Sequence, residues 1–427
     1  MTAVAWIGDL AVLAETKVCF RSLAGAVGEA GVCDGFGVSA RFSNPSALAA
    51  DGRGQLFIAD SLNHVIRKIG PEGQVTSLAG FAQDLDEDGI VEGGASDGVG
   101  PAARFNFPAG VAVDVQGFVY VSDAWNHTIR RVSPAGMVTT IAGQTGNHGH
   151  RDGPAAQALF DDPCGIAVDS IGNLFVAERG AHIIRKISRE GAVVTLAGLP
   201  GQSGTADGQS EHARFDSPGG VALDSAGNLW VADTGNHTIR MVTQDGLVKT
   251  VAGVPGTFGH LDGEAGSALF SGPSGLGVDR KGVVYVADTR NNAIRRLDPS
   301  GFVETISSPE LEGSDDSALA PGSHFLGPSG LALGSGGAIL VADAGNNVIR
   351  TGVVVKEVNL RVSFDGGLPV LLISDGAGRS CTIEACSDPR PAAPWTTLFK
   401  LDLTTQTVLV RDHTAAGVPF RLYRVRP

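Results

Sequence analysis

The chain has few cysteines and few aromatic residues. Its 427 residues include five cysteines, and aromatic side chains make up 6% of the total. An odd number of widely spaced cysteines fits neither a disulfide framework nor a zinc site. They are Cys19, Cys33, Cys164, Cys381 and Cys386. We therefore expect thiols that are buried or idle.

The sequence also lacks an excess of basic residues and a long apolar run. Lys and Arg number 32 against 45 Asp and Glu, which gives a net charge of −13. Phosphate binding needs a positive face, so this composition argues against a nucleic-acid partner. No apolar run approaches the ~20 residues of a membrane-spanning helix. Residues 1–14 are apolar but have no basic start, so they make a poor signal peptide. A misassigned start and an export signal further upstream are the two explanations.

Glycine is abundant, with 60 residues, and it accompanies an internal repeat. Six times, an acidic residue is followed seven residues later by an arginine. Successive acids are 63 residues apart once and 55 residues apart four times. The pairs are Asp60 and Arg67, Asp123 and Arg130, Glu178 and Arg185, Asp233 and Arg240, Asp288 and Arg295, and Asp343 and Arg350. A period in this range with short strands predicts the blades of a β-propeller.

Each repeat has the pattern of one four-stranded blade. Residues 215–253 contain four short runs rich in β-branched residues, each bounded by Gly, Asn or Asp, which predicts four antiparallel strands. The sixth repeat has three such runs within 329–351, and residues 18–25 match the missing fourth. We predict an all-β fold with almost no helix: a six-bladed β-propeller over residues 18–352, closed by its N-terminal strand.

Features that recur in all six repeats are expected to be structural. A phenylalanine precedes a proline by three residues in every repeat, and we expect its ring to fill the space between blades. The acid and arginine suit a hydrogen-bonded pair within each blade. The phenylalanines are Phe42, Phe105, Phe160, Phe215, Phe270 and Phe325. Departures from the repeat are then the candidate functional sites.

The turns resemble those of bacterial NHL-repeat propellers. The matching segments are Ala-Asp-Ser-Leu-Asn-His-Val-Ile-Arg at 59–67, Asp-Ala-Trp-Asn-His-Thr-Ile-Arg at 123–130 and Asp-Thr-Gly-Asn-His-Thr-Ile-Arg at 233–240. The resemblance covers about residues 18–352 and implies a six-bladed propeller. The histidine of these turns gives way to Asn292 and Asn347 in the last two repeats, so the turn does not require it.

Residues 353–427 lie outside the repeat. They contain about six alternating runs separated by Gly- and Pro-rich turns, which predicts a small β-sandwich. The segments Thr-Ile-Glu-Ala-Cys-Ser-Asp at 382–388 and Phe-Arg-Leu-Tyr-Arg-Val-Arg at 420–426 resemble a C-terminal module of exported proteins from environmental bacteria. That resemblance implies attachment or display, so we expect an extracytoplasmic protein: periplasmic, secreted or on the cell surface.

An insertion between the first two repeats carries the pattern of a calcium loop. Asp84, Asp86 and Asp88 alternate and are followed by a glycine, as in the first half of an EF-hand loop. Alternate carboxylates converge on one hard cation, and the glycine permits the sharp turn. The twelfth position is Ala95, so Glu92 is the candidate to complete the site. The alternative is a solvated acidic loop.

Histidines in the loops between blades are a second departure. His148 and His150 alternate in one loop, and His260 lies in a loop two blades further on. Such residues suit a transition metal. Peptidyl-hydroxyglycine lyases are propellers of similar repeats with histidine-bound zinc, and lactonases are also propellers. A metal-dependent lyase or hydrolase at the central channel is therefore the alternative function, against solvent-exposed loop histidines.

Two further departures favour a binding role. Trp125 lies in a turn, where it is a candidate exposed aromatic residue. Arg179 lies in the one turn that replaces the Asp-x-x-Asn pattern. We predict a binding or scaffold propeller that presents its loop face to a protein, a peptide or a glycan, with a purely structural surface protein as a third interpretation.

Overall fold

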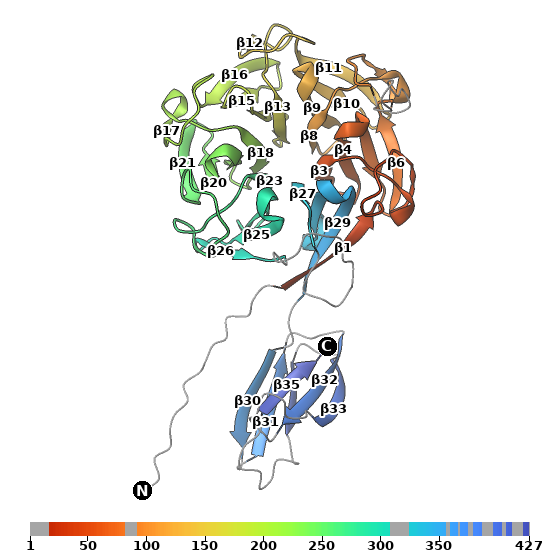
Figure 1. Cartoon of the computed structure of the whole chain (residues 1–427), viewed down its shortest axis with the longest axis vertical. Helices are drawn as coiled ribbons and strands as arrows, with labels where there is room; N and C mark the ends of the chain where they lie inside the picture. The colour runs from red at the N-terminus through yellow and green to blue at the C-terminus, as the bar shows by residue number, and fades with distance from the viewer. Residues whose placement is uncertain are drawn as a thin grey trace. The chain divides into compact units, whose positions relative to one another are not determined.

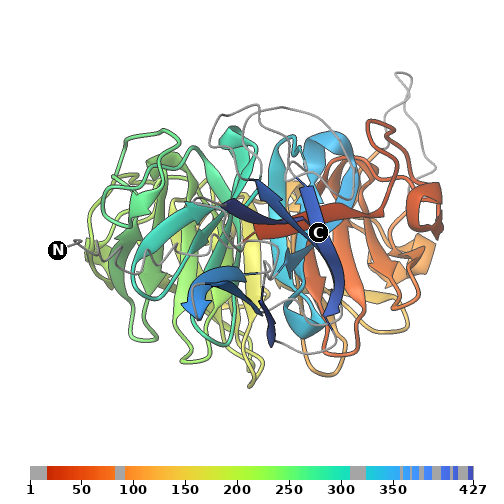
Figure 2. The same ribbon diagram turned by 90° about the horizontal axis from the view of Figure 1, so that it is seen from below.

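The computed structural model describes residues 17–81, 92–307 and 324–355, and beyond these chiefly the backbone of strands between 359 and 426. The chain divides into a compact unit of Val18–Val353 and a second unit of Met1–Lys17 and Val354–Pro427. The first unit is a ring of six sheets around a central axis (Figure 1). Figure 2 shows this ring edge-on as a disc, with the blade strands running between its two faces.

The sheets are numbered as blades in chain order, and their strands are given from the axis outward. Blade one has β3 (Pro45–Ala50), β4 (Leu56–Asp60), β5 (Val65–Ile69), β6 (Gln74–Ala79) and β2 (Gly35–Phe36); blade two has β8 (Pro108–Val113), β9 (Val119–Asp123), β10 (Thr128–Val132), β11 (Met137–Gly143) and β7 (Gly98–Val99). Blade three has β13 (Pro163–Val168), β14 (Leu174–Glu178), β15 (Ile183–Ile187), β16 (Ala192–Ala197) and β12 (Gly153–Pro154); blade four has β18 (Pro218–Leu223), β19 (Leu229–Asp233), β20 (Thr238–Val242), β21 (Leu247–Ala252) and β17 (Gly208–Gln209). Blade five has β23 (Pro273–Val278), β24 (Val284–Asp288), β25 (Ala293–Leu297), β26 (Phe302–Thr305) and β22 (Gly263–Glu264); blade six has β27 (Pro328–Leu333), β28 (Ile339–Asp343), β29 (Val348–Val355) and β1 (Lys17–Ala24).

The N-terminal strand completes the last blade. Blade six runs in the order β27, β28, β29 and β1, so its outermost described strand comes from the start of the propeller (Figure 1). Pairing β1 with β29 gives each of them a hydrogen-bonding neighbour. The predicted six-bladed propeller closed by its N-terminal strand is confirmed. The prediction of almost no helix is also confirmed, because the described helices are three-residue 3₁₀ turns.

Five blades carry a short outer strand that the sequence pattern did not predict. In blade two this strand is held by Asp97, whose carboxylate accepts hydrogen bonds from Arg130 Nη2 at 2.8 Å and from the backbone N–H of Thr140 at 3.0 Å. The same arrangement recurs at Asp34, Asp152, Asp207 and Asp262. In each of these blades, therefore, one carboxylate holds the short outer strand against the fourth strand.

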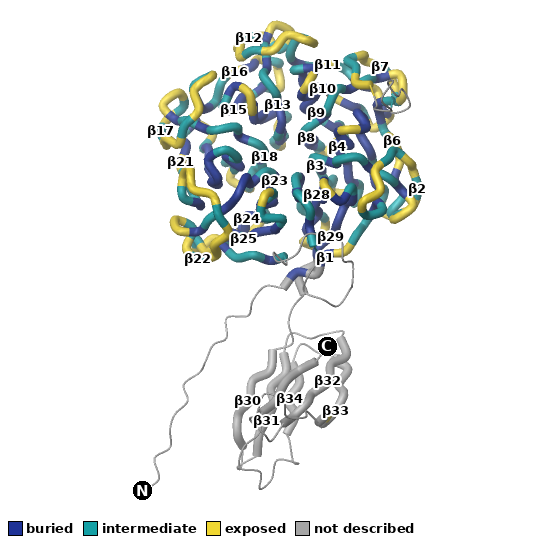
Figure 3. The backbone as a smooth tube through the Cα atoms, viewed as in Figure 1, coloured by how far each residue is buried: buried dark blue, intermediate teal, exposed yellow. Residues whose placement is uncertain are grey.

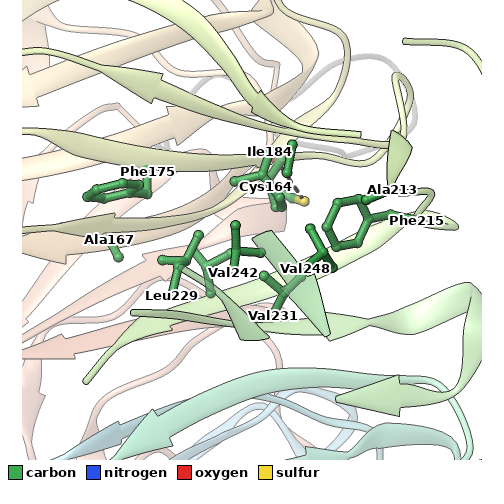
Figure 4. Close-up of a cluster of buried hydrophobic side chains, with 13 residues drawn as sticks. Cys164, Ala167, Phe175, Ile184, Ala213, Phe215, Leu229, Val231, Val242 and Val248 are labelled. Atoms are coloured by element: carbon green, nitrogen blue, oxygen red, sulfur yellow. Dashed lines mark hydrogen bonds between the residues drawn. The ribbon is translucent and has the colours of Figure 1, made fainter. Parts of the chain in front are cut away.

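The core lies within and between the blades, and exposed residues are concentrated in the loops (Figure 3). One cluster joins Cys164, Ala177 and Ile184 of blade three to Phe215 and Val248 of blade four (Figure 4). All six repeated phenylalanines have 0% exposure. They fill the space between blades as predicted, which buries the largest apolar surface that the repeat provides.

The repeated acid and arginine form buried ion pairs. Arg130 Nη1 donates to Asp123 Oδ2 at 2.6 Å, and both side chains have 0% exposure. The same nitrogen donates to the carbonyl of Arg104 at 2.9 Å, and the guanidinium lies 5.1 Å from the ring centre of Phe105. The other five pairs are buried in the same way. This confirms that the pairs are structural, since each one joins the strands of its own blade to its phenylalanine.

Five of the six innermost strands have glycine where they pack against the next blade, and blade one has Ala47 at that position. A Cβ on Gly110 would lie 2.0 Å from the carbonyl oxygen of Cys164 in the next blade, and one on Gly220 would lie 2.0 Å from that of Ser274. Both distances are far shorter than any van der Waals contact, so only glycine lets neighbouring backbones approach this closely.

The described residues of the C-terminal unit form six strands in two antiparallel sheets. One sheet has the order β30 (Asn359–Asp365), β31 (Leu368–Ser374) and β34 (Thr407–Arg411), and the other β33 (Thr396–Leu403), β32 (Arg379–Cys386) and β35 (Leu422–Arg426). The face-to-face packing of a sandwich stays a prediction. Among the residues whose structure is described, no helix is long and apolar enough to cross a membrane.

Candidate functional site

One face of the ring carries the turns between the second and third strands of the blades, and is called the turn face below. Each turn ends in a histidine or asparagine with a left-handed backbone, such as His237 at φ 59° and Asn347 at φ 58°. Asparagine and histidine are among the non-glycine residues enriched in this conformation. The side chain of each then accepts a hydrogen bond from the next blade.

These contacts, called the blade joints, link each blade to its successor. They run from Phe107 N to His64 Nδ1 (2.8 Å), Asp162 N to His127 Nδ1 (3.4 Å), Ser217 N to His182 Nδ1 (2.9 Å), Gly272 N to His237 Nδ1 (3.0 Å), Gly327 N to Asn292 Oδ1 (2.7 Å) and Asn44 N to Asn347 Oδ1 (2.8 Å). Every donor is the residue before the proline that starts an innermost strand. The position therefore requires an acceptor, and both residue types supply one.

Blade two departs from the other blades on the turn face. The rings of Phe107 and Trp125 are stacked, with centres 4.8 Å apart and planes inclined by 13°. Trp125 is 56% exposed. At the position of Phe107 the other blades have Asn, Asp, Ser or Gly, and at that of Trp125 they have Leu62, Gly180, Gly235, Arg290 and Gly345. The pair is thus an exposed aromatic platform that the repeat does not require.

Blade three carries an exposed cation and a carboxylate on the turn face. Arg179 is exposed, and its Nε lies 3.7 Å from Asp162 Oδ2. The equivalent positions in the other blades have small residues: Ser61, Ala124, Thr234, Thr289 and Ala344. The backbone N–H of Asp162 donates to Nδ1 of His127. His127 follows Trp125 by two residues, so blades two and three meet at this point. The exposed cation is a second departure from the repeat.

His148 covers the joint between blades two and three. Its ring lies 5.7 Å from that of His127, and burial lowers the pKa of His127. In blade five Phe258 lies over His237 in the same way, at 5.9 Å. We refer to Phe107, Trp125, His148, Asp162 and Arg179 as the Trp125 patch.

The other loop histidines lie elsewhere. His150 is exposed in the loop that enters blade three. His260 lies in the loop that enters blade five, where its Nε2 is 2.9 Å from Thr305 Oγ1 and burial lowers its pKa. Within the described parts of the chain, no three His, Cys, Asp or Glu side chains are grouped to hold a metal ion.

The predicted calcium loop falls largely outside the described residues. Asp84, Asp86 and Asp88 are among the residues that are not described, and Glu92 is exposed at the point where the description resumes. Calcium at this loop therefore stays a prediction.

Cys164 is placed where a reactive thiol is not expected. It is 3% exposed, and its Sγ donates to the carbonyl of Pro218 at 3.1 Å. Burial raises the pKa of this thiol. Ser46 and Ser329 make the equivalent contact to the next blade in their own positions, so Cys164 acts as a structural donor.

Sequence reasoning missed Phe107 and Asp162 as members of the site. Both occupy the position before the proline, so a comparison of that column of the repeat would have shown the single aromatic residue. Their contacts depend on the packing of one blade on the next, which a repeat pattern does not specify.

Comparison with known proteins agrees with the fold. The family described as NHL repeat matches residues 105–131, 215–240 and 270–297. NHL repeat-containing protein 2 of Bos taurus is 29% identical over 335 residues, which cover 69% of this chain and 44% of that protein. Teneurin-3 of Danio rerio is 26% identical over 362 residues, which cover 74% of this chain and 12% of that protein. The chain thus spans less than half the length of these relatives.

Two solved structures from Bacteroides thetaiotaomicron share the architecture. A structural genomics protein of unknown function has a TM-score of 0.61 at 19% identity, covering 79% of this chain and 76% of its own. An auxiliary nutrient binding protein has a TM-score of 0.59 at 14% identity, covering 79% and 77%. At these identities the likeness shows the fold alone. The chain carries NHL repeats on a six-bladed β-propeller.

Proposed function

We propose that this chain is a non-catalytic binding propeller that presents the Trp125 patch on its turn face to a protein, peptide or glycan partner. The stacked pair of Phe107 and Trp125 carries the proposal. An exposed tryptophan offers a large apolar surface with one polar N–H, and Trp and Arg are enriched among the residues that dominate binding energies. Nothing in the repeat requires an aromatic residue at either position.

The surroundings of the platform favour recognition by a rigid site. The backbone N–H of Phe107 is held by His64, and that of Trp125 donates to the carbonyl of Asn106 at 3.1 Å. A site held in this way loses little conformational entropy when a partner binds. Arg179 and Asp162 supply polar groups on the turn face of the next blade. The naming of a Bacteroides protein of this architecture as an auxiliary nutrient binding protein supports binding as a role.

The test compares two matched substitutions. Labelled full-length protein is screened on peptide and glycan arrays, and the Trp125→Ala and Leu62→Ala variants are measured against each partner found. Leu62 is the equivalent residue of blade one and is 43% exposed. We expect Trp125→Ala to weaken binding at least about tenfold and Leu62→Ala about twofold or less. Equal binding by wild type and Trp125→Ala would remove the patch from the proposed function.

The alternative, a metal-dependent lyase or hydrolase, is tested by the metal content of the protein. Elemental mass spectrometry on protein purified without chelator distinguishes the two. Stoichiometric zinc or iron would favour the enzyme, whereas about one calcium per chain would fit our further proposal that the loop with Asp84, Asp86, Asp88 and Glu92 binds calcium. We also propose an extracytoplasmic location, which the resemblance of the C-terminal segment to modules of exported proteins supports.

A further inference from the structure

We propose that four of the six blade joints open when their histidine is protonated, so that acid loosens the turn face. The four histidines are His64, His127, His182 and His237. The consequence for partner binding rests on the proposed function, because Phe107 and Asp162 of the Trp125 patch are two of the four donors. The opening of the joints does not depend on it.

The geometry fixes the protonation state of each ring. In every histidine joint Nδ1 accepts a hydrogen bond from a backbone N–H, so Nδ1 carries no proton and any ring proton is on Nε2. An imidazolium has a proton on both nitrogens. Protonation would therefore turn N–H toward N–H and leave a backbone donor without its acceptor. The left-handed backbone of the histidine restricts how its ring can move to relieve this.

Two joints provide an internal control. Asn292 and Asn347 occupy the same place in blades five and six and accept the same hydrogen bond, at 2.7 and 2.8 Å. A primary amide does not titrate in the range where histidine does. Acid is then expected to act on the joints from blade one through to blade five and to spare those between blades five and six and between blades six and one.

Burial and charged neighbours together set the pH at which a histidine joint responds. His127 faces Asp161, Asp162 and His148, and His237 faces Asp216, Asp288 and Arg290. The carboxylates favour the imidazolium, whereas burial, His148 and Arg290 oppose it. Burial is the largest influence on both rings and lowers the pKa of each below the usual 6.5.

The joint between blades three and four also has a carboxylate close to its histidine. His182 Nδ1 lies 3.5 Å from Asp216 Oδ1, and that carboxylate is partly exposed.

Hydrogen–deuterium exchange, resolved to single amides and corrected for intrinsic rates, tests this without any partner. Full-length protein is compared at about pH 7.5 and about pH 5, where an exposed histidine changes charge. We expect the protection of Phe107, Asp162, Ser217 and Gly272 to fall about tenfold, the scale of one lost hydrogen bond. The amides of Asn44 and Gly327 should keep theirs. An equal loss at all six amides, or no loss at any, would overturn the proposal.

A double variant that keeps a hydrogen-bond acceptor at both joints tests the role of the histidines without removing the contacts that hold the ring together. His182→Asn with His237→Asn installs the acceptor that blades five and six already use. At about pH 5 this variant should retain protection at Ser217 and Gly272 and still lose it at Phe107 and Asp162. Loss at all four amides would show that these histidines are not the groups that respond to acid. Because no partner is present, this result is separate from the array measurements on Trp125.

Discussion

The side-chain oxygen of Asn347 accepts a 2.8 Å hydrogen bond from the backbone N–H of Asn44, a residue 303 positions earlier in the chain. This contact closes the ring between blades six and one, next to the pairing of β1 with β29. It uses the same geometry as the histidine joints, with an amide in place of imidazole. The position therefore selects for a short acceptor that tolerates a left-handed backbone, which explains why histidine occupies it in four blades and asparagine in two.

Loss of a buried arginine should destabilise its whole blade. Arg130→Met leaves the carboxyl of Asp123 buried without its partner, and burial already raises the pKa of Asp123 to about 6 despite Arg130. We expect a loss of about 3–5 kcal/mol in the free energy of unfolding, measured by urea denaturation. Arg131→Met is the control, because Arg131 is exposed and lies over Phe118. It should cost less than about 1 kcal/mol. Equal losses in the two variants would contradict the assigned role of the pair.

The contact between the innermost strands of blades four and five should not accept a methyl group. Gly220→Ala places Cβ 2.0 Å from the carbonyl oxygen of Ser274, so blades four and five must move apart. Overpacking of this kind costs about 1–3 kcal/mol, and calorimetry should show a lower melting temperature. Gly266→Ala is the control, because no atom lies within 4 Å of its added Cβ. If both variants melt at the same temperature, the inner strands are less tightly packed than described.

Acid should reduce stability through His237. Burial lowers the pKa of His237 in the folded protein, so the unfolded chain binds a proton first as the pH falls. The stability that neutral His237 contributes is present above the unfolded pKa of about 6.5 and is lost below it. The difference in unfolding free energy between wild type and His237→Asn should therefore change in favour of the variant between about pH 7.5 and about pH 5.

Buried carboxyl groups change the pH dependence of the unfolding free energy in the opposite direction, so the comparison must cancel their contribution. Burial raises the pKa of Asp233 to about 6 and that of Glu178 to about 7, so the folded protein binds protons first at these sites. Their contribution is common to both proteins and cancels in the difference. His212→Asn is the control, because His212 is exposed on an outer 3₁₀ turn. A pH-dependent difference for His212→Asn as large as that for His237→Asn would exclude the joint as its origin.

Calcium should stabilise the protein through the acidic insertion. If the loop binds calcium, adding it at about one hundred times its dissociation constant raises the free energy of unfolding by about 2.7 kcal/mol. Asp84→Ala with Asp88→Ala should abolish this gain, and Glu72→Ala, an exposed acid of blade one, should retain it. Identical melting of the native protein with calcium and with a chelator would contradict the prediction.

Most of the fold follows from the sequence because the repeat samples the same interactions six times. The acid, the arginine and the phenylalanine each recur at a fixed place, and their burial is the reason for the recurrence. The position of β1 followed from counting strands, since one blade lacked a fourth. These inferences use only spacing within a blade.

What escaped prediction involves contacts between segments that no pattern relates. The outer strands depend on Asp97 and its counterparts reaching the arginine of a strand 33 residues later. Phe107 belongs to the site only because Trp125 stacks on it. Trp125 lies in the turn after β9, and Phe107 lies just before β8. Side-chain partners between loops are set by the closed ring, and spacing along the chain does not reveal them.

The pairing of β1 with β29 has a consequence for how the protein is made. The first strand of the propeller leaves the ribosome before any blade exists, and its partner in blade six is synthesised last. Protein synthesis adds about 5–20 residues per second, so β1 has no partner strand on that edge for on the order of tens of seconds. Ring closure is therefore a late, long-range folding step. During synthesis this open edge is the part of the propeller most in need of a chaperone.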